Sequence, residues 1–192
     1  MKARAKSRTK AKTKVKAKLK SHSKVKAKAK TRTKAKARVL PIPAGYNSVI
    51  PYMTIQNAAR AIEYYKSVFG AKEVMRLSHD GVIAHAEIKI GDSKIMIGDE
   101  SLAMGARGPE AFGGSPVTIH LYIKNVDEVV RRAVDAGARI TQPVQDKFYG
   151  DRAGALTDPF GHKWYVSTHI EDVSKKEMAR RMDEMMKKQA AG

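Results

Sequence analysis

The chain has 192 residues, a length that corresponds to one domain of about 100–200 residues, and its charge distribution indicates an additional tail. Its 38 Lys and Arg residues outnumber 19 Asp and Glu, for a formal net charge of +19, and the absence of cysteine excludes disulfides and thiolate metal sites. No apolar run reaches the length of a membrane span or of a signal peptide, so we expect a cytoplasmic protein.

The positive charge is concentrated in the first 38 residues. They hold 18 of the 38 Lys and Arg residues and none of the 19 acids, so the other 154 residues carry 20 basic against 19 acidic side chains. Every even position from Lys2 to Arg38 is basic except His22. Ordering a residue costs about 1–2 kcal/mol, and this segment has nothing apolar to bury in return. We therefore expect residues 1–38 to form a disordered basic tail.

Such a tail predicts a polyanionic partner. Neutralising phosphates releases counterions, which favours non-specific, salt-dependent binding of nucleic acid. Anionic membrane surfaces are a rival partner, and a solvated tail with incidental affinity for acidic molecules is the plainer alternative. Residues 39–45 contain two prolines and are interpreted as a linker. The lysines taken to represent the nucleic-acid contact are Lys10, Lys12, Lys14, Lys16, Lys18 and Lys20.

From residue 46 onward, the sequence repeats one pattern at an offset of 68 residues. Asn57 and Asn125 each stand at the start of an amphipathic segment, where Asn is a favourable helix N-cap. Gly70 and Gly137 follow the two segments, where Gly favours a helix C-terminus. The sequence therefore predicts two helices in equivalent places.

Strand-like segments surround both helices. One strand precedes each helix and three follow it, which predicts two βαβββ units, at residues 46–100 and 115–173. This is an α+β fold in which a curled mixed sheet encloses a cleft. Residues 103–114 contain four glycines. We expect them to connect the two units, and their composition also suits a mobile flap over the cleft. The predicted strands are 49–55, 73–78, 82–90, 93–98, 117–123, 139–142, 152–157 and 162–168.

Residues 174–192 are predicted to form a C-terminal amphipathic helix. Ser174 and Glu177 have the spacing of a capping box. Four methionines then recur at helical spacing, and such a stripe is typical of packing against the body or against a partner subunit. The four are Met178, Met182, Met185 and Met186.

Two motifs near the end of the second unit resemble a known family. Residues 148–152, Phe-Tyr-Gly-Asp-Arg, precede a turn at 158–161, Asp-Pro-Phe-Gly, which is followed by His162 and Trp164. Over roughly residues 46–173, the chain resembles the glyoxalase/bleomycin-resistance (vicinal oxygen chelate) superfamily, in its PhnB-like branch. The resemblance implies the tandem βαβββ fold, a small-molecule ligand and a homodimer. It also implies either a lyase, isomerase or dioxygenase activity, or non-catalytic sequestration as in resistance proteins.

Metal-using members of that superfamily supply His and Glu ligands from four inward positions. The resemblance places Ile50 or Pro51, Met96, Thr118 and Tyr165 at these positions, and none is a good ligand. A shift of two residues would bring His120 into the place of Thr118, which restores only one ligand. We therefore expect no cofactor, and a divalent metal is disfavoured.

Three residues are candidates for catalysis. His85 and Glu87 share one face of a predicted strand, so they form either a general base with its supporting carboxylate or a structural hydrogen-bonded pair. His120 lies in an apolar strand as either an interior histidine or a cleft residue.

Candidate substrate-binding residues cluster in the second unit. Arg152 with Tyr149 could hold a carboxylate or a phosphate, or Arg152 could form a salt bridge that braces its loop. Trp164 is expected in the core or in a pocket wall. The full set is Thr118, His120, Tyr122, Tyr149, Arg152, Trp164 and Tyr165. Three functions therefore stand side by side: a small-molecule enzyme without the usual metal site, a small-molecule binding protein, and a nucleic-acid-associated protein that acts through its tail.

Overall fold

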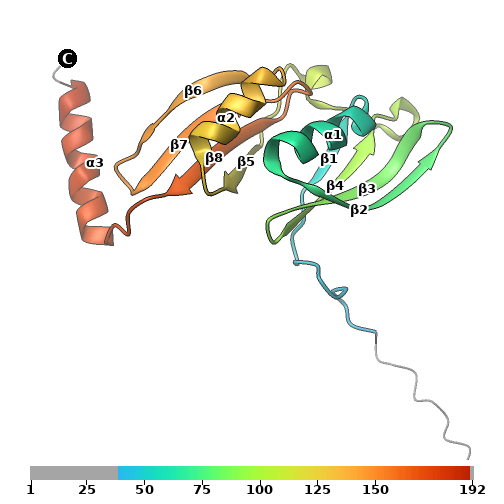
Figure 1. The fold of residues 1–192 in the computed structure, drawn as a ribbon, viewed down its shortest axis with the longest axis horizontal. Coiled ribbons are helices and arrows are strands. Elements are labelled where there is room, and N and C mark those ends of the chain that lie inside the picture. Colours follow the sequence, from blue (N-terminus) through green and yellow to red (C-terminus); the bar gives the residue numbers. More distant parts are fainter. Residues whose placement is uncertain (1–38, 191–192) are drawn as a thin grey trace, which may run out of the picture. The chain divides into compact units, whose positions relative to one another are not determined.

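A computed structural model describes residues 39–190, and those from Leu40 onward belong to one compact unit (Figure 1). The predictions for the basic tail and its lysines lie outside the described residues. Within these residues, no helix is both long and apolar enough to cross a membrane. The elements are β1 (Tyr52–Ile55), α1 (Ala58–Phe69), β2 (Lys72–His79), β3 (Val82–Ile90), β4 (Ser93–Asp99), β5 (Thr118–Tyr122), α2 (Val126–Asp135), β6 (Arg139–Asp146), β7 (Asp151–Thr157), β8 (Lys163–His169) and α3 (Lys175–Ala190), with short 3-10 turns at Leu102–Met104 and Pro109–Phe112.

The strands form two four-stranded mixed sheets of the same topology. The first has the order β1-β4-β3-β2 and the second β5-β8-β7-β6. In each sheet the strand that comes first in the chain pairs in parallel with the strand that comes last in the chain, β1 with β4 and β5 with β8. The other pairs are antiparallel. This confirms the predicted α+β fold built from two βαβββ units.

Both central helices begin in the same way. Asn57 and Asn125 cap them through side-chain oxygens that accept from Arg60 N and Glu128 N, as predicted. The first amide of each helix also donates to a side chain at the end of the last strand of its unit. Ala58 N bonds Asp99 Oδ1 at 2.7 Å, and Val126 N bonds Thr168 Oγ1 at 2.9 Å. Each helix is thereby tied to its own sheet at one end.

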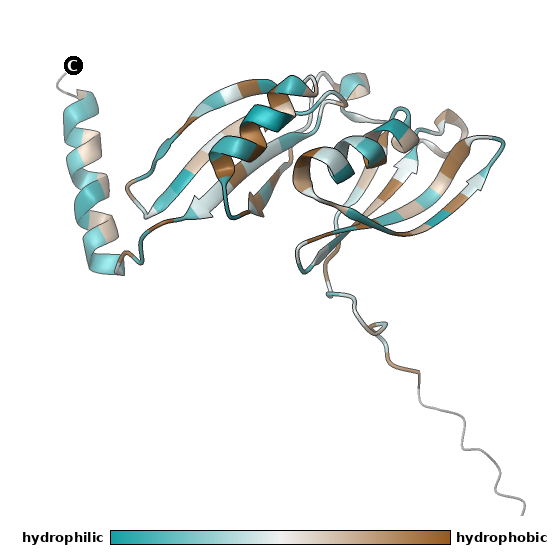
Figure 2. Cartoon of the chain, viewed as in Figure 1, coloured by the Kyte–Doolittle hydropathy of each residue, from teal (hydrophilic) through white to brown (hydrophobic). Residues whose placement is uncertain are grey.

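The core lies on the helix side of the sheets. The amphipathic pattern of α1 and α2 turns their apolar side chains inward, and Figure 2 shows hydrophobic and hydrophilic residues side by side along α2. The two units meet there, with the rings of Phe69 and Trp164 centred 4.5 Å apart. The contact joins the units on the helix side of their sheets, and cavities of about 340 and 380 Å³ lie near β1 and β5.

The Asp158 carboxylate fastens this core. It is only 4% exposed, and it accepts hydrogen bonds from Tyr65 Oη at 2.7 Å and Trp164 Nε1 at 2.8 Å. It also accepts from the backbone amides of Phe160 and His162 at 2.9 Å each. The predicted turn at 158–161 therefore links the first helix to the last strand as well as reversing the chain.

Two strands differ from the prediction by more than one residue at an end. β1 begins at Tyr52 instead of Val49, because Val49 is exposed and Pro51 has no amide hydrogen to donate. β6 continues to Asp146 instead of ending at Gln142. It passes Pro143 because it is an edge strand whose pairing with β7 is interrupted by bulges on either side of Gln142.

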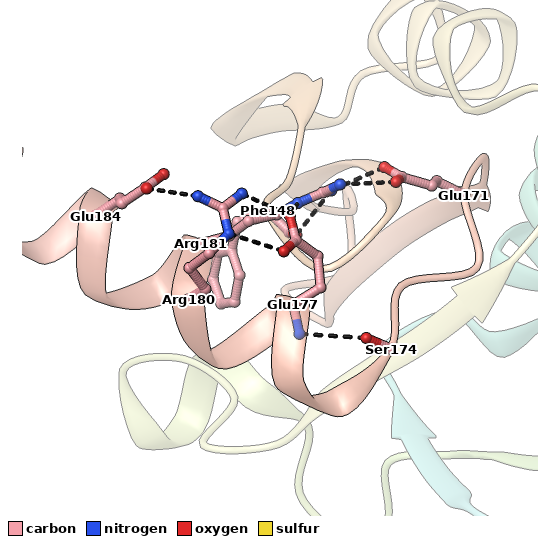
Figure 3. Close-up of polar contacts among 7 residues, drawn as sticks. All are labelled: Phe148, Glu171, Ser174, Glu177, Arg180, Arg181 and Glu184. Carbon is pink, nitrogen blue, oxygen red and sulfur yellow. Dashed lines mark hydrogen bonds and ion pairs between the residues drawn. The ribbon is translucent and has the colours of Figure 1, made fainter.

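The C-terminal helix α3 is attached to the body by one arginine (Figure 3). Arg181 makes paired bonds to Glu171 at 2.7 and 2.8 Å, and its guanidinium also reaches Glu177 and the carbonyl of Phe148. Ser174 Oγ accepts from the Glu177 amide at 3.2 Å, which is one half of the predicted capping box, while the Glu177 carboxylate accepts from Arg180 and Arg181.

The methionine stripe of α3 is not fully buried by the body. No residue of this helix is fully buried, Met182 and Met186 are 46% and 56% exposed, and Figure 2 shows the helix as mainly hydrophilic. Met178 and Met185 are half-buried, so burial of the stripe is partial. Packing against a partner subunit stays a prediction.

Candidate functional site

The open face of the second sheet gathers most of the predicted binding residues. Along β8, Trp164 and Val166 point into the core on the α2 side, so Tyr165 and Ser167 lie on the opposite side. The register places His120 of β5 opposite Tyr165, and Tyr122 opposite Ser167. We call the group on this side the tyrosine face: His120, Tyr122, Tyr149, Asp151, Tyr165 and Ser167.

Aromatic rings and hydroxyls alternate across the tyrosine face. The His120 ring stacks on Tyr122 with centroids 4.6 Å apart, and Tyr165 meets it edge-on at 5.1 Å. His120 Nε2 lies 2.9 Å from Ser167 Oγ, and the hydroxyls of Tyr149 and Tyr165 lie 2.7 Å apart. The arrangement offers ring surfaces for stacking together with polar atoms that fix orientation.

Asp151 is a buried member of this face. Its carboxylate is 2% exposed, accepts from Tyr122 Oη at 2.9 Å and lies 2.7 Å from His169 Nδ1. The hydrogen bond to Asp151 raises the pKa of Tyr122, whereas burial and the neighbouring Tyr165 raise the pKa of Tyr149. Both phenols therefore stay protonated near neutral pH, and the hydrogen of Tyr122 is donated to Asp151.

A cavity of about 340 Å³ opens beside the tyrosine face. His120 and Tyr122 line it from β5, and Pro51 and Lys94 line it from the first unit. Trp164 closes part of its wall. The volume lies within the range of about 300–1,000 Å³ typical of small-molecule sites.

The other predicted binding residues lie elsewhere. Arg152 bonds Asp127 through two nitrogens at 2.7 Å each and Asp146 at 2.9 Å, which is the salt-bridge alternative. Thr118 pairs with Lys163 at the exposed start of β5, on the same side of the sheet as His120 and Tyr122 but beyond the network that those residues form. Trp164 is fully buried in the core while also contacting the cavity.

Sequence reasoning missed three members of this network. Ser167 and His169 share a strand face with Tyr165, and that period of two was the available signal. The role of Asp151 depends on strand register, because its partners Tyr122 and His169 come from two other strand positions. No pattern within a single segment reveals it.

The catalytic candidates His85 and Glu87 lie on the first sheet in a closed network. Glu87 is 2% exposed and accepts from Tyr46 Oη at 2.6 and 2.8 Å and from Lys94 Nζ at 3.1 Å. His85 Nε2 lies 3.6 Å from Glu87, beyond hydrogen-bond distance. The Tyr46 hydroxyl, opposed by burial and aided by Lys94, lowers the pKa of Glu87. The geometry matches a structural network better than a base poised for proton transfer.

The positions expected to hold a metal carry other side chains. The register sets Tyr52 opposite Met96 and His120 opposite Tyr165, so His120, and not Thr118, is level with Tyr165. Within residues 39–190, no group of three or more His, Cys, Asp or Glu residues is placed to hold a metal ion. The residues present do not fit the usual four-ligand site, and the expected lack of a cofactor stays a prediction.

Comparison with known proteins identifies the family. Residues 48–166 match the model of the Glyoxalase/Bleomycin resistance protein/Dioxygenase superfamily. Protein Rv0887c of Mycobacterium tuberculosis is 36% identical over 136 residues, covering 69% of this chain and 80% of that protein. The crystal structure of TioX from Micromonospora sp. ML1 covers 67% of this chain and 100% of its own, at 24% identity and a TM-score of 0.51. A PhnB protein from Bacillus cereus covers 64% and 99%, at 16% identity and a TM-score of 0.53. The chain belongs to the Glyoxalase/Bleomycin resistance protein/Dioxygenase superfamily, and its fold has PhnB-like neighbours.

Proposed function

We propose that the protein binds a small molecule with a flat, polar or aromatic portion on the tyrosine face and holds it without transforming it. The observation that carries this proposal is the group of stacked rings and protonated hydroxyls around His120, beside a cavity of about 340 Å³. A ligand ring would stack or meet these rings edge-on, which contributes about 0.5–1.5 kcal/mol for each pair.

Binding without turnover is preferred over a lyase, isomerase or dioxygenase for two reasons. The buried carboxylate of the tyrosine face, Asp151, is already engaged by Tyr122 and His169. The other candidate base, His85, lies on the first sheet beside a Glu87 that Tyr46 and Lys94 occupy. The third candidate, His120, lies on the tyrosine face itself with its Nε2 atom 2.9 Å from Ser167 Oγ. Asp151 and His120 are thus both engaged within this face, and His85 lies on the other sheet.

A homodimer is part of the proposal. Tyr122 of the tyrosine face is exposed, and the family resemblance implies that a second copy covers this side. Mass measurement in solution checks the assembly, and a monomer at micromolar concentration would remove this part.

Ligand binding can be followed through the single tryptophan. Trp164 contacts the cavity, so a ligand there should change its fluorescence. A panel of phenols and heteroaromatic compounds should contain members that bind in a saturable way. His120→Ala should weaken their binding about tenfold, which is 1.4 kcal/mol. The matched variant Tyr52→Phe, on the first sheet, should leave binding unchanged, and equal weakening by both variants would contradict the proposal.

Metal content separates this proposal from the enzymatic alternatives. Purified protein should bind Ni²⁺, Zn²⁺ or Fe²⁺ weakly, and EDTA should not alter ligand binding. Tight one-to-one metal binding, or consumption of a bound compound that EDTA stops, would favour a metal-dependent enzyme.

A second candidate function rests on the basic tail. We propose that it attaches the protein to nucleic acid, because it carries 18 basic side chains and no acid. Replacing Lys10, Lys12, Lys14, Lys16, Lys18 and Lys20 with Gln should lower the slope of log affinity against log salt by up to about 5 for duplex DNA. An unchanged slope would reject this function and leave ligand binding at the tyrosine face untouched.

A further inference from the structure

A second cavity, of about 380 Å³, lies beside β1 and apart from the tyrosine face. It is lined by Pro51–Thr54 of the first unit, by parts of the connection between Arg107 and Val117, and by Ile119 and His162 of the second unit. None of the three tyrosines of the tyrosine face contributes to its lining. The two cavities share Pro51 and Ile119 as walls, but their polar side chains differ, and the proposed function does not use this one.

His162 lines this cavity, and its ring holds a polar atom without a hydrogen-bond partner in the described part of the chain. Its Nε2 atom is buried and has no hydrogen-bond partner among residues 39–190. Burial lowers the pKa of His162, against the opposing effects of the Asp158 carboxylate and the Thr54 backbone, so the ring is neutral at pH 7. Leaving a buried polar atom unpaired costs about 1–3 kcal/mol, which a ligand that displaces part of the wall and bonds to Nε2 would recover.

Arg107 brings a positive charge to the same cavity. It is exposed and forms no salt bridge within the described part of the chain, whereas Arg131, Arg132 and Arg152 each pair with a carboxylate. A guanidinium presents parallel N–H donors that match a carboxylate. The cavity therefore has one donor group suited to an anion.

Most of the remaining wall is apolar. Pro51, Ile119, Val117 and Phe112 line it, and the last two side chains are largely exposed. Phe112 ends a short 3-10 turn that is followed by two glycines with positive φ, so the backbone beyond it has the freedom to adjust. The wall suits a compact hydrocarbon group attached to the anion.

We propose that this cavity is a binding site for a small carboxylate with an aromatic or branched aliphatic body. The carboxylate pairs with Arg107, a polar atom of the ligand bonds to His162 Nε2, and the apolar body lies against Phe112 and Ile119. The connection between the two units thus supplies two of the ligand-binding side chains, Arg107 and Phe112.

Benzoate is the probe that tests this site. Titration into the full-length protein, in 0.5 M NaCl to screen the basic tail, should show saturable binding by calorimetry. The ring signals of His162 should move in ¹H–¹³C spectra. Benzamide, which has the same shape without the charge, should bind at least about tenfold more weakly, because a charged hydrogen bond contributes about 1.5–3 kcal/mol.

Variants separate this site from other basic or aromatic regions. Arg107→Gln should weaken benzoate binding about tenfold, and Phe112→Ala should weaken it less. Arg131→Gln removes the same charge from α2 and should have no effect, nor should Tyr165→Phe on the tyrosine face. Absence of saturable binding, equal loss in the two arginine variants, or an unmoved His162 signal during binding would overturn the proposal. Loss of binding in Tyr165→Phe would place benzoate on the tyrosine face and would overturn it as well.

Discussion

The open face of the first sheet carries the ion pair of Glu87 and Lys94, which Tyr46 covers. The open face of the second sheet carries tyrosines and a histidine beside a cavity. The backbones of the two units follow one plan, down to a strand-end side chain that accepts from the first helix amide, Asp99 in one and Thr168 in the other. Their open-face residues differ, with Glu87 and Lys94 against His120 and Tyr165. The two units thus share a backbone plan and a capping asparagine at the start of each helix, while the chemistry of their open faces differs.

The largest expected effect on the free energy of unfolding comes from the turn before the last strand of the second unit, compared with the matching turn of the first unit. Asp158→Ala should destabilise the protein by about 3–5 kcal/mol, because it leaves the buried donors of Tyr65 and Trp164 unpaired. The matched change in the first unit, Asp92→Ala, removes an exposed side chain and should cost less than about 0.5 kcal/mol. Urea unfolding of both variants measures the difference. Similar losses would mean that Asp158 does not join the units.

The glycines before the central strands should also respond unequally. Gly81 and Gly150 both have positive φ, at 80° and 94°, but only Gly150 is crowded. A Cβ atom there would overlap the carbonyl of Glu171 and come within 2.9 Å of Val173 Cγ2. Gly150→Ala should therefore cost more than about 3 kcal/mol, against about 1–2 kcal/mol for Gly81→Ala. The comparison uses thermal unfolding, and equal costs would contradict the crowding.

Replacing Tyr46, which lies over the first sheet, should have a smaller effect on stability. Tyr46→Phe removes both hydrogen bonds to Glu87 but keeps the ring over Lys94, whose Nζ lies 3.4 Å from the ring centre. We expect a loss of about 1–2 kcal/mol. Tyr149→Phe, on the tyrosine face, should cost less than Tyr46→Phe, because its partner is a neutral hydroxyl. Chemical denaturation of the two variants orders them, and the reverse order would refute this reasoning.

The smallest effect depends on pH. Hydrogen bonds to Asp151 and Asp172 raise the pKa of His169 in the folded protein above its unfolded value of about 6.5. The stabilisation from charged His169 is therefore full below about pH 6.5 and is lost as the pH rises through the folded pKa. The difference in unfolding free energy between the native protein and His169→Gln should be greatest near pH 5.5 and should shrink towards pH 9. A difference that grows with pH would show the opposite sign of the shift.

Local patterns predicted the scaffold well. Asn57 and Asn125 mark both helix starts, and a period of two places His120 with Tyr122 on one side of a strand. Pairings between distant segments were not predictable. Tyr46 lies in a segment without periodicity and meets Glu87 across 41 residues, and Arg152 meets Asp127 only because α2 packs on β7. Such contacts depend on the completed fold, and therefore the occupants of each open face could not be assigned in advance.

The strand order also bears on how the chain acquires its structure. Because β1 pairs with β4 and β5 with β8, the first strand of each unit can pair only after the last strand of that unit has been synthesised. The antiparallel β2-β3-β4 and β6-β7-β8 meanders connect neighbours and can form from local contacts, since closing short loops is faster than closing long ones. During synthesis, the first half can therefore complete its sheet while the second is still emerging. A ribosome paused beyond Asp99 would then carry one finished half of the molecule.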